Sequence, residues 1–204
     1  MHTITALVLG KKNENMVNIY LDDEYYTNVP IDFVVEYNLK KGRELSDSDL
    51  ALLELDKLRA TAYIYVLNSV SRRSVSVADM RRKLYDKEYP SAVVEEVIAK
   101  AKGYNYLDDD YYAKCYVEQN IKRKGSLRIK AELKQHGISD ELINKYLKKS
   151  DEEVEVALKE AEKFASRLDL TDAKDKNKLI RHMQYKGYNW EIITKCLSYL
   201  ENEL

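Results

Sequence analysis

Apolar residues recur with the same spacing in three stretches of the chain. The first stretch has apolar side chains at positions 80, 84, 93, 94, 97 and 98. A shift of 49 residues gives positions 129, 133, 142, 143, 146 and 147, and a further shift of 50 gives 179, 183, 192, 193, 196 and 197. An i, i+4 pair followed by an i, i+1, i+4, i+5 set is typical of two short helices that each bury one face. The pattern therefore predicts a tandem helical repeat.

A tight turn is predicted between the two helices of each stretch. Gly137 and Gly187 stand where the first helix of the second and third stretches ends, a position that often needs a left-handed backbone. Ser139 and Asn189 follow two residues later as predicted N-caps, and Pro90 takes this place in the first stretch.

A further helix is expected upstream of each pair, at 50–68, 111–122 and 154–167. Each unit then holds three helices in about 50 residues, which alone bury little surface, so the units must stack or dock. We predict a mainly α protein with three tandem three-helix repeats, at 50–104, 105–150 and 151–204, in an elongated curved array.

The first 49 residues follow a different pattern. Segments 3–9 and 17–21 are short and β-prone, and the polar segment 10–15 between them favours a hairpin. A third short strand is expected at 25–27, and a short helix with Pro30 in its first turn, where the missing N–H costs nothing. We predict a small β-rich N-terminal module over residues 1–49.

The composition excludes several classes of protein. With 45% hydrophobic and 34% charged residues, the chain builds cores and is not a disordered polymer. It has neither a run of 18 apolar residues nor a basic leader, so we expect no membrane segment and no secretory signal. Cys115 and Cys196 lie 81 residues apart in helical patterns, which favours a reduced, cytoplasmic protein.

The formal net charge of −1 hides an uneven distribution. The predicted N-terminal module carries a net −4, the first two repeats +3 each, and the third repeat −3. We therefore expect an anionic partner to bind the middle hundred residues.

The basic residues of the first two repeats fall at equivalent places, in a loop and on the helix that follows it. Such loops offer cations, hydroxyls and backbone N–H groups at a helix start, which suits phosphate, although many charge runs are only solvated helix faces. The third repeat departs, since Asp169, Asp172 and Asp175 interleave with its lysines. The recurrence predicts a DNA-binding or acidic-partner-binding surface made of Arg72, Arg73, Arg81, Arg82, Lys83, Lys122, Arg123, Lys124, Arg128, Lys130 and Lys134.

Catalytic and metal-binding patterns find little support in the sequence. Consecutive residues such as Asp108, Asp109 and Asp110 do not converge on one ion, and they precede a predicted helix where an N-cap is needed. His136 and His182 lie near turns of different repeats, and neither they nor His2 have metal-site spacing. Phosphate-binding, nucleophile and zinc motifs do not occur. We predict no enzyme activity, cofactor or metal. Seventeen tyrosines suit base stacking, a protein interface or core edges, and mark no site.

The repeat region resembles the RecX family. The resemblance is carried by YLDDDYYAKCYV (106–117), by 124–133 and 136–139, and by parts of the flanking repeats: Ala62, Arg73, 80–84 and 178–188. It covers roughly residues 50–200, and the segment 1–49 is similar to a β-rich extension found in some members. Glu88 departs from the family, which usually has glycine there, so the first turn is expected to differ.

The resemblance implies a regulator of the RecA recombinase. Such proteins bind the RecA–DNA filament along its groove and inhibit ATP hydrolysis and strand exchange, so the implied partners are the RecA filament and DNA, contacted directly or through RecA. We expect a monomer whose repeats together supply avidity. Two other hypotheses remain open: a helical adaptor for an acidic protein that touches no nucleic acid, and, with less support, a nucleic-acid enzyme.

Overall fold

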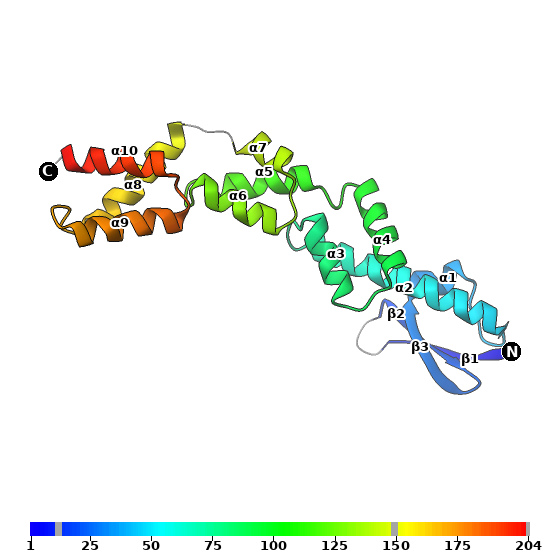
Figure 1. Ribbon diagram of the computed structural model, residues 1–204. Helices are drawn as coiled ribbons and strands as arrows, with labels where there is room; N and C mark the ends of the chain where they lie inside the picture. Colours follow the sequence, from blue (N-terminus) through cyan, green and yellow to red (C-terminus); the bar gives the residue numbers. More distant parts are fainter. Residues whose placement is uncertain (11–13, 148–150, 203–204) are drawn as a thin grey trace. The chain divides into compact units, whose positions relative to one another are not determined.

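The computed structural model describes residues 1–10, 14–147 and 151–202 (Figure 1). These residues are mainly helical, with a small antiparallel sheet at the N-terminus. They form two compact units. The first consists of Met1–Val75 with Met80–Leu107, and the second of Ser76–Asp79 with Asp108–Leu204.

The N-terminal sheet has the strand order β3-β2-β1-β4. The predicted hairpin is confirmed as β1 (His2–Leu9) with β2 (Met16–Leu21), and the third strand as β3 (Glu24–Pro30). Residues 11–13 of the predicted turn lie outside the described residues. A fourth strand, β4 (Glu44–Leu45), was not predicted, because two residues carry no readable alternation.

A small apolar core joins this sheet to the first helices. Ile4, Val29 and Leu45 are almost completely buried with Phe33 of α1 (Ile31–Glu36). Leu53 joins them from α2 (Asp47–Val70). Pro30 lies at the N-cap of α1 rather than in its first turn, where its missing N–H is equally harmless.

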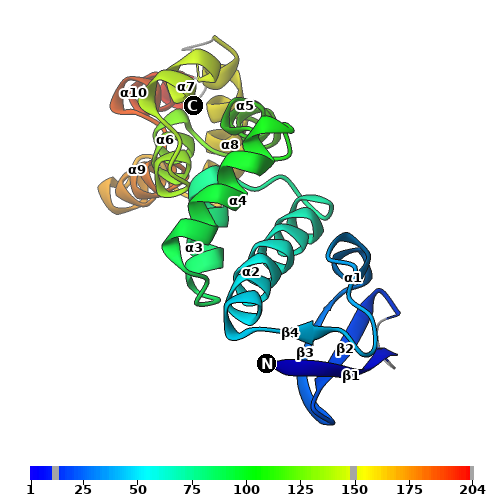
Figure 2. The same cartoon turned by 90° about the vertical axis from the view of Figure 1, so that its right-hand side faces the viewer.

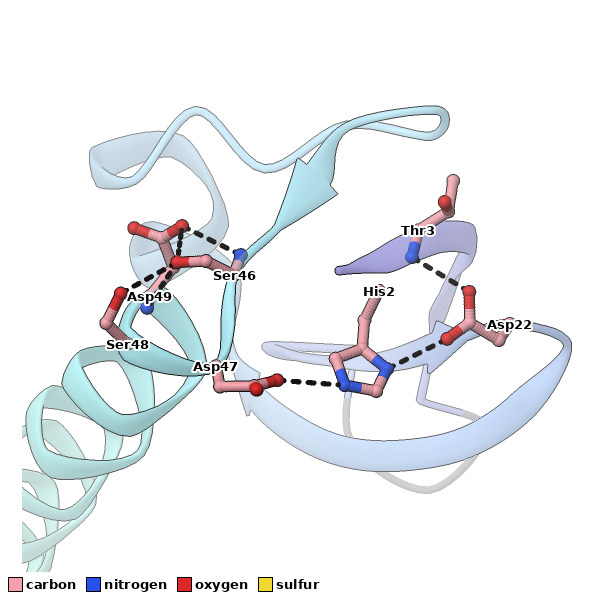
Figure 3. A network of polar contacts seen from close by, with 7 residues as sticks. All are labelled: His2, Thr3, Asp22, Ser46, Asp47, Ser48 and Asp49. Atoms are coloured by element: carbon pink, nitrogen blue, oxygen red, sulfur yellow. Dashed lines mark hydrogen bonds and ion pairs between the residues drawn. The ribbon is translucent and has the colours of Figure 1, made fainter.

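Polar contacts fix the start of α2 against the sheet (Figure 3). Ser46 and Asp49 form a reciprocal capping box, in which the Ser46 side chain accepts from the Asp49 N–H and the Asp49 carboxylate accepts from the Ser46 N–H. The His2 ring lies between two carboxylates, with Nδ1 at 2.9 Å from Asp22 and Nε2 at 3.3 Å from Asp47. His2, the first residue of β1, thus has a structural role.

The first three-helix set consists of α2, α3 (Val77–Tyr85) and α4 (Ser91–Gly103). In Figure 2, α2 runs between α1 with the strands on one side and α4 on the other. The apolar positions predicted for this set are buried, namely Met80, Leu84, Val93, Val94, Val97 and Ile98.

The second unit holds two further three-helix sets. One is α5 (Asp109–Asn120), α6 (Ser126–Gln135) and α7 (Asp140–Tyr146), and the other is α8 (Asp151–Ala165), α9 (Ala173–Lys186) and α10 (Trp190–Asn202). Each has its own core, which contains the predicted positions Ile129, Leu133 and Ile143 in one set and Leu179, Met183, Ile192, Ile193 and Cys196 in the other. The predicted mainly α fold with three three-helix sets is confirmed.

The turns inside the three sets share one backbone conformation. Gly137 and Gly187 have φ of 75° and 90°, as predicted from their C-terminal positions. Glu88 has φ of 61°, so the first turn keeps the left-handed residue although it lacks glycine. The expectation of a different turn was wrong in this respect.

Candidate partner-binding surface

The loop between α2 and α3 presents two unpaired cations. Arg72 and Arg73 are exposed, and among the described residues neither side chain has a hydrogen bond or ion pair. The loop begins where α2 ends at Val70, with the Ser71 N–H still donating to Leu67 O at 3.0 Å. These two guanidinium groups are therefore available to an anionic partner.

The equivalent loop between α5 and α6 presents a second such pair. Lys122 and Arg123 are exposed, and within the described part of the chain neither side chain is paired. The backbone N–H groups of Arg123 and Lys124 donate to Asn120 O, which holds this loop as a continuation of α5. Lys122 and Arg123 thus resemble Arg72 and Arg73 in being exposed and without a partner among the described residues.

Two other predicted cations of the second repeat are held by one carboxylate. Lys124 Nζ lies 2.7 Å from Glu132 Oε2, and Arg128 Nε donates to Oε1 of the same residue at 3.0 Å. Tyr116 donates its hydroxyl to this carboxylate as well. Burial would raise the pKa of Glu132, but these hydrogen bonds lower it to about 2. Lys124 and Arg128 therefore stabilise the repeat in addition to charging its surface.

Most remaining cations on the second helices also have partners. Arg81 pairs with Glu95 at 2.8 Å, while Lys130 and Lys134 share Asp140 at 3.6 and 2.9 Å. In the first repeat, Arg82 is exposed and Lys83 is half-buried. The surface predicted from the sequence thus separates into two groups. Arg72, Arg73, Lys122 and Arg123 have no partner among the described residues, whereas most of the other cations, the loop residue Lys124 included, are paired.

The starts of α3 and α6 do not offer the free N–H groups that the sequence suggested. The Val77 N–H donates to Asp109 Oδ1 at 2.9 Å, and the equivalent Ser126 N–H donates to Glu153 Oε1 at 2.7 Å. Gly125 N and Leu127 N donate to the carbonyls of Lys186 and Gly187 at 2.9 and 3.1 Å. A phosphate would therefore find the amides of Val77, Gly125, Ser126 and Leu127 already occupied.

The same region explains the two turn glycines. A Cβ on Gly137 would collide with Ala78 Cβ, and one on Gly187 would lie 2.6 Å from Arg128 N and 2.9 Å from Arg128 Cα. Both turns therefore pack against the start of a preceding second helix at a distance that only glycine allows. Glu88 is exposed, which is why its turn tolerates a side chain.

The Asp108–Asp110 triplet has the capping role predicted for it. Asp108 accepts hydrogen bonds from the N–H groups of Asp110 and Tyr111, at the N-cap of α5. Asp109 receives the Val77 N–H, and Asp110 contacts Lys145 and Tyr146, each at 2.6 Å. The three carboxylates thus have different partners and do not converge on one point.

The other candidate residues have structural contacts. His136 Nδ1 lies 2.7 Å from Asp79 Oδ2, and His182 Nε2 lies 2.7 Å from Glu160. Across residues 1–10, 14–147 and 151–202, no cluster of three metal-ligating side chains occurs. None of the helices in those ranges combines the length and apolar character needed to span a bilayer.

Sequence reasoning missed two lysines on the first helix of the third set. Lys159 and Lys163 are exposed on α8 and line one hollow together with Lys122. Their i, i+4 spacing was the available signal, but the acidic residues interleaved with them are typical of an ordinary solvated helix face.

The fold, with its two equivalent basic loops, defines a tandem α-helical repeat protein with a β-rich N-terminal module. Family models of RecX match four successive segments: the N-terminal domain at 2–46 and the first, second and third three-helix domains at 62–100, 108–147 and 151–197. The chain belongs to the RecX family of regulatory proteins.

Individual relatives agree with this assignment over nearly the whole chain. A Regulatory protein RecX from Bacillus pumilus is 33% identical over 97% of this chain and 77% of its own length. One from Clostridioides difficile is 31% identical over 99% and 97%. A crystal structure of regulatory protein RecX matches with a TM-score of 0.69 at 27% identity, covering 94% of this chain and 97% of that one.

Proposed function

We propose that this protein regulates the RecA recombinase by binding along the groove of the RecA–DNA filament, where it suppresses ATP hydrolysis and strand exchange. Membership of the RecX family supports RecA as the target. The structural observation that carries the proposal is the pair of equivalent loops with free cations, Arg72 and Arg73 in one repeat and Lys122 and Arg123 in the next.

The tandem repeats suit a filament as partner. A filament repeats its protein and phosphate surfaces at regular intervals, so successive three-helix sets meet equivalent surfaces. Repeated weak contacts add up to an avidity that one loop lacks. The protein acts in this proposal as a monomeric, non-enzymatic regulator in the cytoplasm.

The first test is DNA-dependent ATP hydrolysis by the matching RecA, titrated with this protein. Inhibition at well below one molecule per RecA protomer is the expected result, because one bound molecule would affect several protomers. Absence of inhibition at stoichiometric excess would reject the proposal and leave only the repeat fold.

The second test reverses the loop charges. The quadruple variant Arg72→Glu, Arg73→Glu, Lys122→Glu and Arg123→Glu should weaken inhibition while the helix content measured by circular dichroism stays unchanged, because these exposed side chains have no hydrogen bond or ion pair among the described residues. A variant that inhibits as well as the parent would show that these loops do not bind the filament.

A second candidate function is an adaptor for an acidic protein without nucleic acid. The occupied N–H groups at the starts of α3 and α6 favour it, because they remove one usual element of a phosphate site. Salt dependence distinguishes the two, since neutralising phosphates releases counterions and gives a steep loss of affinity with salt.

A further inference from the structure

A hollow of about 610 Å³ lies beside α8 in the second unit. Ile121 and Lys122, just after α5, form one wall. The other wall is a face of α8 that carries Glu155, Val156, Lys159, Glu160 and Lys163. This volume is within the usual range of ligand-binding pockets in proteins.

The rim of this hollow is positively charged. Lys122, Lys159 and Lys163 are exposed, and none has an ion pair among the described residues. Glu160 is already occupied, because His182 Nε2 lies 2.7 Å and Lys186 Nζ 2.9 Å from its carboxylate. Glu155 remains as the one exposed carboxylate among the lining residues, so its single negative charge offsets only one of the three lysines.

The lining is apolar between these charges. Ile121 and Val156 are half-buried aliphatic side chains that the fold leaves partly open. A phosphate group by itself has no apolar part to place on such side chains. An acidic protein segment with an aliphatic or aromatic side chain between two carboxylates satisfies both the lining and the rim.

We propose that this hollow binds an acidic, amphipathic segment of a partner protein. Its apolar side chain packs on Ile121 and Val156, and its carboxylates pair with Lys122, Lys159 and Lys163. The inference rests on the proposed function and deepens it. It assigns this part of the basic surface to the protein component of the filament rather than to its DNA.

A photo-crosslinker placed in the hollow tests the occupant directly. In the variant Glu155→p-benzoylphenylalanine, irradiation on the assembled RecA–DNA filament should give an adduct with a RecA peptide that contains at least two Asp or Glu residues, identified by mass spectrometry. An adduct with DNA, or with a peptide that lacks such acids, would overturn the inference. So would the absence of any adduct while the variant still inhibits ATP hydrolysis.

Charge reversal on α8 supplies the quantitative test. Lys159→Glu with Lys163→Glu should weaken binding to the filament about tenfold, the order expected for two exposed ion pairs that turn repulsive. The matched control is Lys174→Glu with Arg181→Glu, which changes the net charge equally at exposed positions of α9 and should alter affinity less than twofold. Equal effects of the two double variants would overturn the inference.

The two proposals fail in different ways. If the parent protein neither binds nor inhibits the filament, the proposed function is rejected, and this inference with it. If the parent protein inhibits and the α8 variant behaves like its control, the proposed function stands and only the assignment of the hollow is rejected.

Discussion

Replacing Gly187 by alanine should lower the free energy of unfolding of the second unit, although the change adds only one methyl group. Gly187 has φ of 90° and packs against Arg128 at the start of α6. A left-handed alanine costs about 1–2 kcal/mol. Relief of the collision requires the turn to move away, which also strains the hydrogen bonds from Gly125 N to Lys186 O and from Leu127 N to Gly187 O. Each is worth about 1 kcal/mol.

The sum is about 3–4 kcal/mol, and a matched control isolates the part due to close packing. Gly42 has φ of 83°, and among the described residues, its two chain neighbours aside, no atom lies within 4 Å of the place that an alanine methyl group would take there. Gly42→Ala should therefore cost only the conformational part. Urea denaturation followed by circular dichroism should show a midpoint about 1 M lower for Gly187→Ala than for Gly42→Ala, for a slope of about 2 kcal/mol/M.

Hydrogen exchange gives the local readout. The amide protons of Gly125 and Leu127 should exchange faster in Gly187→Ala and remain protected in Gly42→Ala. Equal destabilisation by the two variants, with unchanged protection at these amides, would refute the reasoning that α6 needs the closely packed turn.

Three further changes follow from contacts described above. Glu88→Gly should raise the free energy of unfolding by up to about 1 kcal/mol, because it relieves a left-handed side chain at an exposed turn; a lower urea midpoint would contradict this. Ser46→Ala should cost about 1 kcal/mol through loss of the capping box, measured by the same denaturation, and an unchanged midpoint would show that the cap adds nothing. Glu132 has a pKa lowered to about 2. Its contribution to the free energy of unfolding is therefore complete above the unfolded pKa of about 4.3 and is lost as pH falls toward 2. Glu132→Gln should therefore reduce the loss of stability between these pH values, and an unchanged pH profile would disprove the role of this carboxylate.

The sequence was sufficient for the parts of the fold that depend on local pattern. The spacing of Met80 with Leu84, and of its two copies, identified the buried helix faces because burial imposes the helical period on apolar residues. Gly137 and Ser139 marked the end and start of successive helices for equally local reasons. The two-residue strand β4 was beyond such reasoning, because its pairing with β1 depends on residues some 40 positions away.

The candidate surface was predictable only in part. Recurrence along the chain indicated the loop cations, but not that Glu132 would hold Lys124 and Arg128 or that Glu153 would occupy the start of α6. Lys159 and Lys163 join Lys122 only through packing of α8. The charge pairs form within single repeats, whereas the contact of Glu153 with the start of α6 joins two repeats.

The contacts at the start of α6 also bear on how the chain is divided into fragments. A fragment that stops before α8 loses Glu153, Lys186 and Gly187, which accept hydrogen bonds from three successive amides of its last complete repeat. Its second repeat would retain every residue of its sequence period and still have an unsatisfied helix start. The length of the sequence period is therefore shorter than the stretch of chain that supplies every hydrogen-bond partner of one repeat.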